Sequence, residues 1–559
     1  MSIVPRSARY NVLPMGIPSQ RRSVRQGVQT GNSFKPDGTK IIRINLPQQS
    51  YLDCANTYLC FRHKIVDNTD GNPQTNVNAQ RNNGANNEIC MDNGAFSWIR
   101  NLQIQGADGS VLENIQNYNL LSRVLHRATQ PEDHSQTSAN VLQGYGDIND
   151  RQSWGTNTQG HTYAIQLSAS GILANSKYIP LKYLQGGLTL QLELEDFARC
   201  HQAKDANYTY IIDQVYLHMD LCDFSDEFDA MFRNQLASEG VNIHFDTYSS
   251  HIDNINDSGD VNIEISERAS SVKSVYTVMR KNDNIQDITK DSLGTWTSSE
   301  LDRYRYTLGT TNYPRYDVDC KFGGAIAYAE MLKGFGVLGD INGGSEIDTN
   351  SWRGVASDAS AKYLEIQLIE CISSVGKQAD GRQTTARLTF NGKHGMSAGT
   401  NATHTGTQFT ISNCAANSFN ADGTVGADNP TNNDKGCWIC EAVISDTTII
   451  CERVFSALGA TVEKYTAGTG LAVGKVAYQG FAKVASSATD GKDVRFMLAQ
   501  NFENHFENQI LQTGVSASGA VPLALNLNVG SSDKCRVDTF VHSDKMLTIG
   551  ADGLATVSV

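Results

Sequence analysis

The run GLTLQLELED, residues 187–196, decides the fold class of this chain. Leucines at positions 188, 190, 192 and 194 alternate with threonine, glutamine and glutamate. Such alternation gives a β-strand one apolar face and one polar face. We therefore expect a half-buried strand here, with Glu193 and Glu195 on its solvent side.

Similar strand signals lie on both sides of this run. In the first half they are KIIRINLP (40–47), TYLCFRHKI (57–65), FSWIRNLQIQG (96–106), YAIQLSA (163–169), YIPLKYL (178–184) and YTYIIDQVYLHMDL (208–221). Short segments rich in β-branched and aromatic residues, separated by turn residues, are typical of sandwiches and jelly rolls. The chain is therefore predicted to be mainly β.

One helical segment interrupts the strands of each half. ENIQNYNLLSRVLHR (113–127) and AIAYAEMLKGFG (325–336) carry apolar residues at three- and four-residue spacing. The second half has its own strand signals, at 261–266, 271–281, 303–309, 363–371, 386–390, 407–412, 437–444, 493–502, 522–529 and 535–550. A chain of 559 residues exceeds one core, which stops growing near roughly 250 to 300 residues. We expect two similar domains in tandem.

The predicted domain limits follow the changes in pattern. Residues 1–33 form a basic extended arm, 34–225 the first β domain, 226–240 a helical connector (within SDEFDAMFRNQLASEG) and 241–559 the second β domain with long loop insertions. Polar, turn-rich segments at about 67–95 and 391–437 are expected to be long loops.

Charge separates the arm from the body. Residues 1–36 contain Arg6, Arg9, Arg21, Arg22, Arg25 and Lys35 and no acidic residue, although the whole chain has a net charge of −13. An acidic body argues against a nucleic-acid grip by the domains themselves. The five arginines of the arm could neutralise packaged DNA, bind neighbouring subunits or keep the terminus soluble. These readings stay open.

The motifs that might carry catalysis lack their structural context. Gly334, Gly336 and Gly339 form a G-x-G-x-x-G string, but it follows a predicted helix, whereas a dinucleotide site needs a strand before it. Cys437 and Cys440 are a lone C-x-x-C within a strand signal, without a second pair at zinc-ligand spacing. His394 and His404 lie in a polar loop. We expect no enzyme activity, no cofactor and no metal.

The compartment is predicted from absences in the sequence. No run approaches the roughly 18 apolar residues of a transmembrane segment, and the N-terminus lacks the apolar core of a signal peptide. Twelve scattered cysteines fit reduced, mostly buried thiols. The protein is expected to be made inside a host cell and not secreted.

Several longer strings resemble the double jelly-roll major capsid proteins of polinton-like viruses and virophages. SFKPDGTKIIRINLPQQSYLDCANTYLCFRHKI (33–65), ENIQNYNLL (113–121) and SGILANSKYIPLKYLQGGLTLQLELED (170–196) are similar to the first barrel of that family. ISERASSVKSVYTVMRK (265–281), LGTTNYPRYDV (308–318) and VDTFVHSDKMLTIGADGLATVSV (537–559) are similar to the second. The resemblance runs from about Phe34 to the C-terminus.

This resemblance implies two eight-stranded jelly-roll barrels and a structural role in the virion. Three copies would join into a homotrimeric, pseudo-hexameric capsomer, and capsomers would tile an icosahedral DNA-virus shell together with penton and minor capsid proteins. The arm would lie on the inner side, against packaged DNA or inner shell components. The long loops at about 67–95 and 391–437 would form an outward tower or inter-subunit clamps. The alternative is a glycan-binding or glycan-cleaving β-sandwich protein, which shares the strand content but usually has a secretion signal.

Overall fold

The computed structural model describes most of the two predicted β domains. The described residues are 18–67, 90–131, 134, 137–145, 160–202, 208–288, 292–294, 296–299, 301–320, 325–339, 345–347, 352, 364–371, 385–390, 408–412, 437–445, 448–453, 474–478, 495–503, 513–517, 522–530 and 534–558. Of the residues singled out from sequence, Arg6, Arg9, His394 and His404 lie outside them, as do residues 68–89.

The first domain consists of two facing antiparallel sheets. Its strands are β1 (Ser19–Gly27), β2 (Ser33–Phe34), β3 (Ile41–Leu46), β4 (Tyr51–Asp67), β5 (Cys90–Ala95), β6 (Ile99–Gly106), β7 (Val111–Gln116), β8 (His161–Ile165), β9 (Leu188–Leu194), β10 (His201–Gln202) and β11 (Tyr208–Phe224). One sheet has the order β1-β11-β4-β8, with β2 also paired to β11, and the other has the order β3-β9-β6-β7.

The second domain has the same construction. Its strands are β12 (Val241–Ile255), β13 (Gly259–Ile265), β14 (Val272–Lys281), β15 (Leu301–Leu308), β16 (Thr311–Asp319), β23 (Met497–Asn501), β24 (Leu523–Val529), β25 (Cys535–Ile549) and β26 (Ala555–Ser558). The sheet orders are β12-β25-β14-β23 and β13-β24-β15-β16, with β26 added beside β25.

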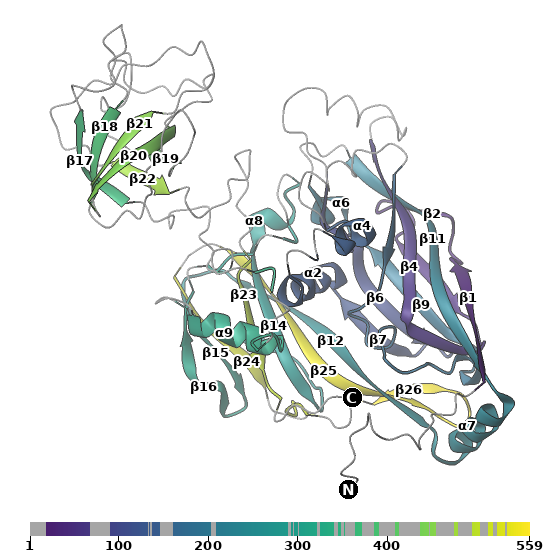
Figure 1. Ribbon diagram of the computed structural model, residues 1–559. Coiled ribbons are helices and arrows are strands. Elements are labelled where there is room, and N and C mark those ends of the chain that lie inside the picture. Colours follow the sequence, from purple (N-terminus) through teal and green to yellow (C-terminus); the bar gives the residue numbers. More distant parts are fainter. Residues whose placement is uncertain are drawn as a thin grey trace, which may run out of the picture. The chain divides into compact units, whose positions relative to one another are not determined.

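Both domains are jelly rolls. We number the strands of the two large sheets in chain order, leaving out the separate pair β10-β5 and the added strand β26. In each domain the first, eighth, third and sixth strands then form one sheet, and the second, seventh, fourth and fifth form the other. In the first domain β1 and β2 share the first position, because both pair with β11. This two-sheet arrangement of Greek keys defines the fold, and its repetition confirms the predicted tandem jelly rolls (Figure 1).

The alternation seen in the sequence sets the core. Every second residue of β9 is buried, as predicted from its leucines. Glu193 stays half-buried beside Arg100, with 3.6 Å between the charged atoms. The prediction that Glu195 faces solvent was wrong. This residue follows the last residue of β9 and is only 4% exposed, because the chain turns inward there and Asn119 and Tyr210 contact it.

Helices α2 (Tyr118–Thr129) and α9 (Ala325–Gly334) follow the fifth strand of their respective jelly rolls. The first helix was predicted to begin near Glu113, but 111–116 is strand β7 and the helix begins only after Asn117, whose φ is 52°. The helical spacing of apolar residues extended the predicted helix too far toward the N-terminus, because Ile115 fits both the buried face of β7 and the apolar face of the helix. After α9 the chain turns at Gly336, with φ of 73°, as expected for a helix end.

Shorter elements complete the two-jelly-roll unit. Helix α7 (Asp226–Glu239) joins β11 to β12, and the Ser225 hydroxyl accepts a hydrogen bond from the Phe228 amide at its N-terminus. The remaining helices are α4 (Ser138–Gln143), η2 (Leu181–Tyr183), α6 (Phe197–Cys200) and α8 (Asn282–Ile285). Over the described part of the chain, the search for an apolar helix of membrane-spanning length gives none.

A second compact unit, Gly354–Lys492, is inserted between α9 and β23. Its strands are β17 (Leu364–Cys371), β18 (Thr385–Phe390), β19 (Gln408–Ser412), β20 (Cys437–Ser445), β21 (Thr448–Arg453) and β22 (Gly474–Tyr478). They close into a barrel of order β17-β18-β21-β20-β19-β22. These strand signals were expected inside the second jelly roll, and β19 lies within a segment expected to be a loop. The structure instead places these strands in a separate unit, because each described strand of the insert pairs with other strands of the insert.

The N-terminal arm also differs from expectation. Strand β1 pairs antiparallel with β11 along Ser19–Gly27, so this part of the arm is ordered on its own chain. The first jelly roll offers the free edge of β11, and backbone hydrogen bonds to that edge satisfy both strands.

Candidate functional site: the seam between the two jelly rolls

The two jelly rolls meet along a contact that we call the seam. From the first domain it includes β7, α2 and residues 168–175, and from the second β12, residues 292–296 and residues 345–347. Both domains belong to one compact unit. The geometry of the seam therefore decides whether they act as a single block.

Glu113 of β7 is the central hydrogen-bond acceptor of the seam. Its carboxylate accepts from the Ser170 hydroxyl at 2.6 Å and from the backbone amides of Gly171 and Ile172 at 2.8 and 3.4 Å. It also accepts from the Thr247 hydroxyl of β12 at 3.0 Å. Burial raises the pKa of Glu113, although all four donors oppose that shift. With donors on both oxygens, the buried carboxylate links the two domains.

The backbones themselves approach closely beside Glu113. A Cβ atom on Gly171 would lie 1.7 Å from the carbonyl oxygen of Asp246 on β12. Two asparagine side chains bridge the same strands: Asn175 donates to the His244 carbonyl at 2.8 Å, and Asn117 donates to the Ser250 hydroxyl at 3.0 Å. Only glycine fits at position 171 without moving one domain away from the other.

Helix α2 adds buried arginines to the seam. Arg127 is 0% exposed, donates to the Gly294 carbonyl and lies over the Trp296 ring, 5.1 Å from its centre. Its own carbonyl accepts from the Ser345 hydroxyl and the Glu346 amide. These contacts hold the end of α2 against the second domain on two sides.

The Glu346 carboxylate faces these arginines from the second domain. Burial opposes its ionisation, but Arg123, Arg127 and Arg495 outweigh burial and lower the pKa of Glu346 to about 2. An Arg495 guanidinium nitrogen lies 3.1 Å from a Glu346 oxygen. A buried carboxylate that stays charged needs such cationic neighbours.

The seam has little internal space. A cavity of about 20 Å³ lies between α2 and the second domain, lined by Asn117, Asn119, Leu120, Glu195, Arg199, Arg280, Ile285, Leu293 and Arg536. This volume can hold about one water molecule. Pockets for small-molecule ligands are on the order of 300 Å³ or more, so the seam is a structural contact and not a substrate pocket.

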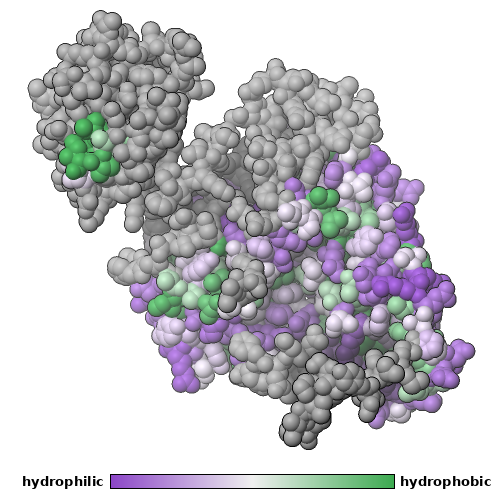
Figure 2. All heavy atoms as spheres, in the orientation of Figure 1, coloured by the Kyte–Doolittle hydropathy of each residue, from purple (hydrophilic) through white to green (hydrophobic). Residues whose placement is uncertain are grey.

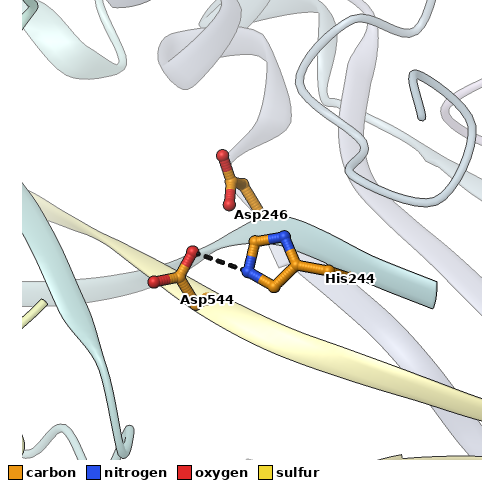
Figure 3. A group of neighbouring side chains, drawn as sticks. All are labelled: His244, Asp246 and Asp544. Carbon is orange, nitrogen blue, oxygen red and sulfur yellow. Dashed lines mark ion pairs between the residues drawn. The ribbon is translucent and has the colours of Figure 1, made fainter. Parts of the chain in front are cut away.

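A charged cluster lies on β12 and β25 of the second domain. His244, Asp246 and Asp544 point toward one another (Figure 3), and one ligand atom from each lies within 4.8 Å of the others. His244 Nε2 is 3.0 Å from an Asp544 oxygen. Asp246 belongs to the strand whose carbonyl contacts Gly171, so this cluster adjoins the seam.

The arginines predicted to carry interactions are partly engaged within the chain. Arg21 lies 2.7 Å from both Asp53 and Asp220. Arg22 donates to the Ser50 hydroxyl at 2.9 Å, and Arg25 lies over the Tyr216 ring. All three sit on β1, which they help to hold against the first domain.

The other sequence motifs play no part in the seam. Gly334 ends α9, and a Cβ there would lie 2.5 Å from that of Ala499, so this glycine allows the helix to pack on β23. Cys440 is buried in β20. Cys54, Cys60, Cys200, Cys222 and Cys535 are buried as well, and Cys320 is half-buried.

The residues of the seam were missed in the sequence. Glu113 and Arg127 were the first and last residues of one predicted helical segment, and neither was singled out. No local pattern marks a carboxylate whose donors lie 57 and 134 residues away.

The comparisons with known proteins are informative only at the level of structure. No protein-family model and no curated protein sequence matches the chain. A chain of the PBCV-1 virus capsid quasi-atomic model aligns with a TM-score of 0.48 and 7% identity, over 98% of both chains. A chain of the Sputnik virophage cryo-EM structure aligns with 0.46 and 9%, over 100% of this chain and 93% of that one.

The crystal structure of the mavirus major capsid protein aligns in the same way. Its TM-score is 0.41 at 7% identity, and the match covers 100% of this chain and 93% of that one. These matches span nearly the whole chain at 7–9% identity. The two jelly rolls themselves are defined by the strand orders given above.

Proposed function

We propose that this chain is a structural shell subunit, the major capsid protein of a DNA virus, and not an enzyme. The observation that carries the proposal is the repeated jelly-roll strand order within one compact unit. Shell subunits need two properties, rigidity and repeated shape. The seam supplies the first through buried hydrogen bonds, and the duplicated domain supplies the second.

The duplicated shape suits a trimer. Three chains with two similar barrels each present six nearly equivalent sides, so the trimer can pack as a hexagon. Such pseudo-hexameric capsomers would tile an icosahedral shell, with penton and minor capsid proteins at the remaining positions. The subunit would then reside in the virion.

One exposed apolar surface is available for contact between copies. Ile326 on α9 is 54% exposed, and Tyr316 on β16 is 52% exposed. The Tyr316 hydroxyl donates to Glu330, one turn along α9 from Ile326, so the two side chains belong to one surface. Figure 2 shows several hydrophobic patches on a largely hydrophilic surface. The pair of Ile326 and Tyr316 is our candidate for the contact between copies.

The ends of the second jelly roll suggest an orientation for the shell. At one end of the β12-β25-β14-β23 sheet, Val241 of β12 follows helix α7 and pairs with Ile549. At the other end, Lys281 pairs with Cys535, and β23 begins close to this pair. The linker and the inserted unit are therefore attached at opposite ends. We infer that the end of the second jelly roll that carries α7 faces the inner side of the shell, together with the N-terminal arm.

The arm has an assembly role in this proposal. Arg21 already has two carboxylate partners on its own chain, which reduces its value for neutralising phosphates. Arg6 and Arg9 precede β1 and remain the candidates for contact with neighbouring capsomers, inner shell components or DNA.

The test is the mass of the full-length protein by light scattering after size exclusion, with negative-stain microscopy of the same peak. Three copies of the 61.0 kDa chain would give about 183 kDa and a hexagonal outline. Ile326→Asp should weaken that trimer, whereas Ile252→Asp, at a residue 51% exposed on β12, serves as the matched control. A monomer at every concentration would overturn the proposal, and glycan-array binding would then favour the alternative.

A further inference from the structure

The cluster of His244, Asp246 and Asp544 has the composition and placement of a metal site. His244 and Asp246 are two residues apart on β12, so their side chains share one face of the strand. Asp544 on β25 is the direct cross-strand partner of Asp246. Three potential ligands thus converge from two neighbouring strands, with one nitrogen and two carboxylates (Figure 3).

The ligand atoms lack hydrogen-bond partners. His244 Nε2, Asp246 Oδ1 and Asp544 Oδ1 are buried atoms that make no hydrogen bond. Asp544 is only 1% exposed, so water does not compensate its free oxygen. His244 Nε2 lies 3.0 Å from that oxygen without hydrogen-bond geometry. A buried polar atom without a partner is costly, and a cation would satisfy all three.

Hydrogen bonds behind the ligands orient them. The Ser271 hydroxyl donates to the other Asp544 oxygen at 2.7 Å and accepts from the Gly514 amide at 3.0 Å. Such outer contacts fix ligand orientation in metal sites. They leave Asp544 Oδ1 directed at His244.

His542 completes the surroundings on the other side of Asp246. The Ser274 hydroxyl lies 3.2 Å from His542 Nδ1, and His542 Nε2 lies 3.5 Å from an Asp246 oxygen, so this imidazole borders the cluster. The carboxylates of the cluster still need a compensating positive charge.

Lys273 of β14 supplies only part of that charge. Its ammonium nitrogen is 3.2 Å from Asp246 and 3.7 Å from both Asp544 and Glu503. One ammonium faces three carboxylates, so Lys273 alone does not balance their charge. Lys273 has a flexible stem and can remain paired with Glu503 when a cation takes its place between the aspartates.

We propose that His244, Asp246 and Asp544 bind a divalent transition metal of the zinc class. Imidazole nitrogen with carboxylate oxygens suits zinc, whereas calcium and magnesium prefer oxygen ligands alone. The ion would cross-link β12 to β25 next to the seam. This site is independent of the proposed shell function, since it needs only the folded second domain.

The experiment titrates the full-length protein, first dialysed against EDTA, with Zn²⁺ in a calorimeter and with Co²⁺ in a spectrophotometer. One ion per chain and a visible Co²⁺ absorption band are expected. His244→Ala should abolish the band, and Ser271→Ala should weaken binding by about 10- to 100-fold. Lys273→Met should strengthen it. His251→Ala, also on β12 but paired with Glu267, is the matched control and should bind normally.

Two results would overturn the proposal. The first is an unaltered protein that gives neither heat with Zn²⁺ nor a Co²⁺ band. The second is a folded His244→Ala protein that keeps the full affinity. If His244→Ala does not fold, as judged by circular dichroism, the Zn²⁺ affinity of Lys273→Met becomes the test. An affinity equal to that of the unaltered protein would mean that the ion does not bind beside Lys273.

Discussion

Replacement of Glu113 tests whether the seam holds the two jelly rolls together. Glu113→Ala removes the acceptor of two hydroxyls and two backbone amides. The hydroxyls of Ser170 and Thr247 can rotate, but the amides of Gly171 and Ile172 cannot. A buried donor left without a partner costs about 1–3 kcal/mol, so we expect a loss of about 2–6 kcal/mol.

Glu113→Gln should cost less, because one oxygen is kept. The new amide group is best placed at Oε2, where it removes the acceptor of the Ile172 amide at 3.4 Å. The Ser170 hydroxyl, 2.6 Å from the same oxygen, can rotate and accept from the new amide. We expect about 1–3 kcal/mol for this variant. The two substitutions together separate the hydrogen bonds from the volume of the side chain.

The assay combines urea denaturation with hydrogen exchange of peptides that cover residues 168–175. Both variants should lower the denaturation midpoint, and the amides of Gly171 and Ile172 should exchange faster. Glu193→Gln, on the solvent side of β9 and paired with Arg100, is the control and should change stability by no more than about 1 kcal/mol. If Glu113→Ala behaves like this control in both measurements, Glu113 does not hold the seam.

Three further predictions concern the rest of the unit. Gly171→Ala should prevent recovery of folded protein, because its Cβ would meet the Asp246 carbonyl at 1.7 Å, whereas Gly339→Ala, with open space around it, should leave the yield unchanged. Acid should destabilise the protein through His63. Burial, and then a nearby histidine, lowers the pKa of His63 to about 3 in the folded protein, below the unfolded value of 6.5. The stability that neutral His63 contributes above pH 6.5 is therefore lost as the pH falls, by about 2 kcal/mol at pH 5. The melting temperature of His63→Gln should therefore fall less between pH 7 and pH 5 than that of the unaltered protein, and an equal fall would contradict the assignment. Deletion of residues 1–17 should keep the trimer mass, since β1 remains, but prevent shell assembly in microscopy, and normal shells would show that the arm is dispensable.

Some features of this protein were set by local sequence. The leucine alternation of 188–194 predicted β9 and its buried face, and the stretch SDEFDAMFRNQLASEG predicted the helical connector that became α7. The glycines after α9 predicted a turn and not a nucleotide site. These features depend on neighbours a few residues apart, which a single sequence displays.

Other features arose only when distant segments met. The strand signals between 363 and 444 looked like those of a jelly roll, yet the strands there close into a separate barrel. Pairing partners are chosen by register and packing and not by alternation. The same limit hid Glu113, whose donors come from two domains.

The cation cluster shows the limit most clearly. His244 and Asp246 are an unremarkable pair on a strand, and Asp544 follows about 300 residues later, so the sequence predicted no metal. Only the pairing of β12 with β25 sets Asp544 opposite Asp246 and buries its oxygen without a hydrogen bond. Sequence determined which segments become strands, whereas the tertiary structure decided which charges are forced to share a buried space, because electrostatic energy depends on distance in space and not along the chain.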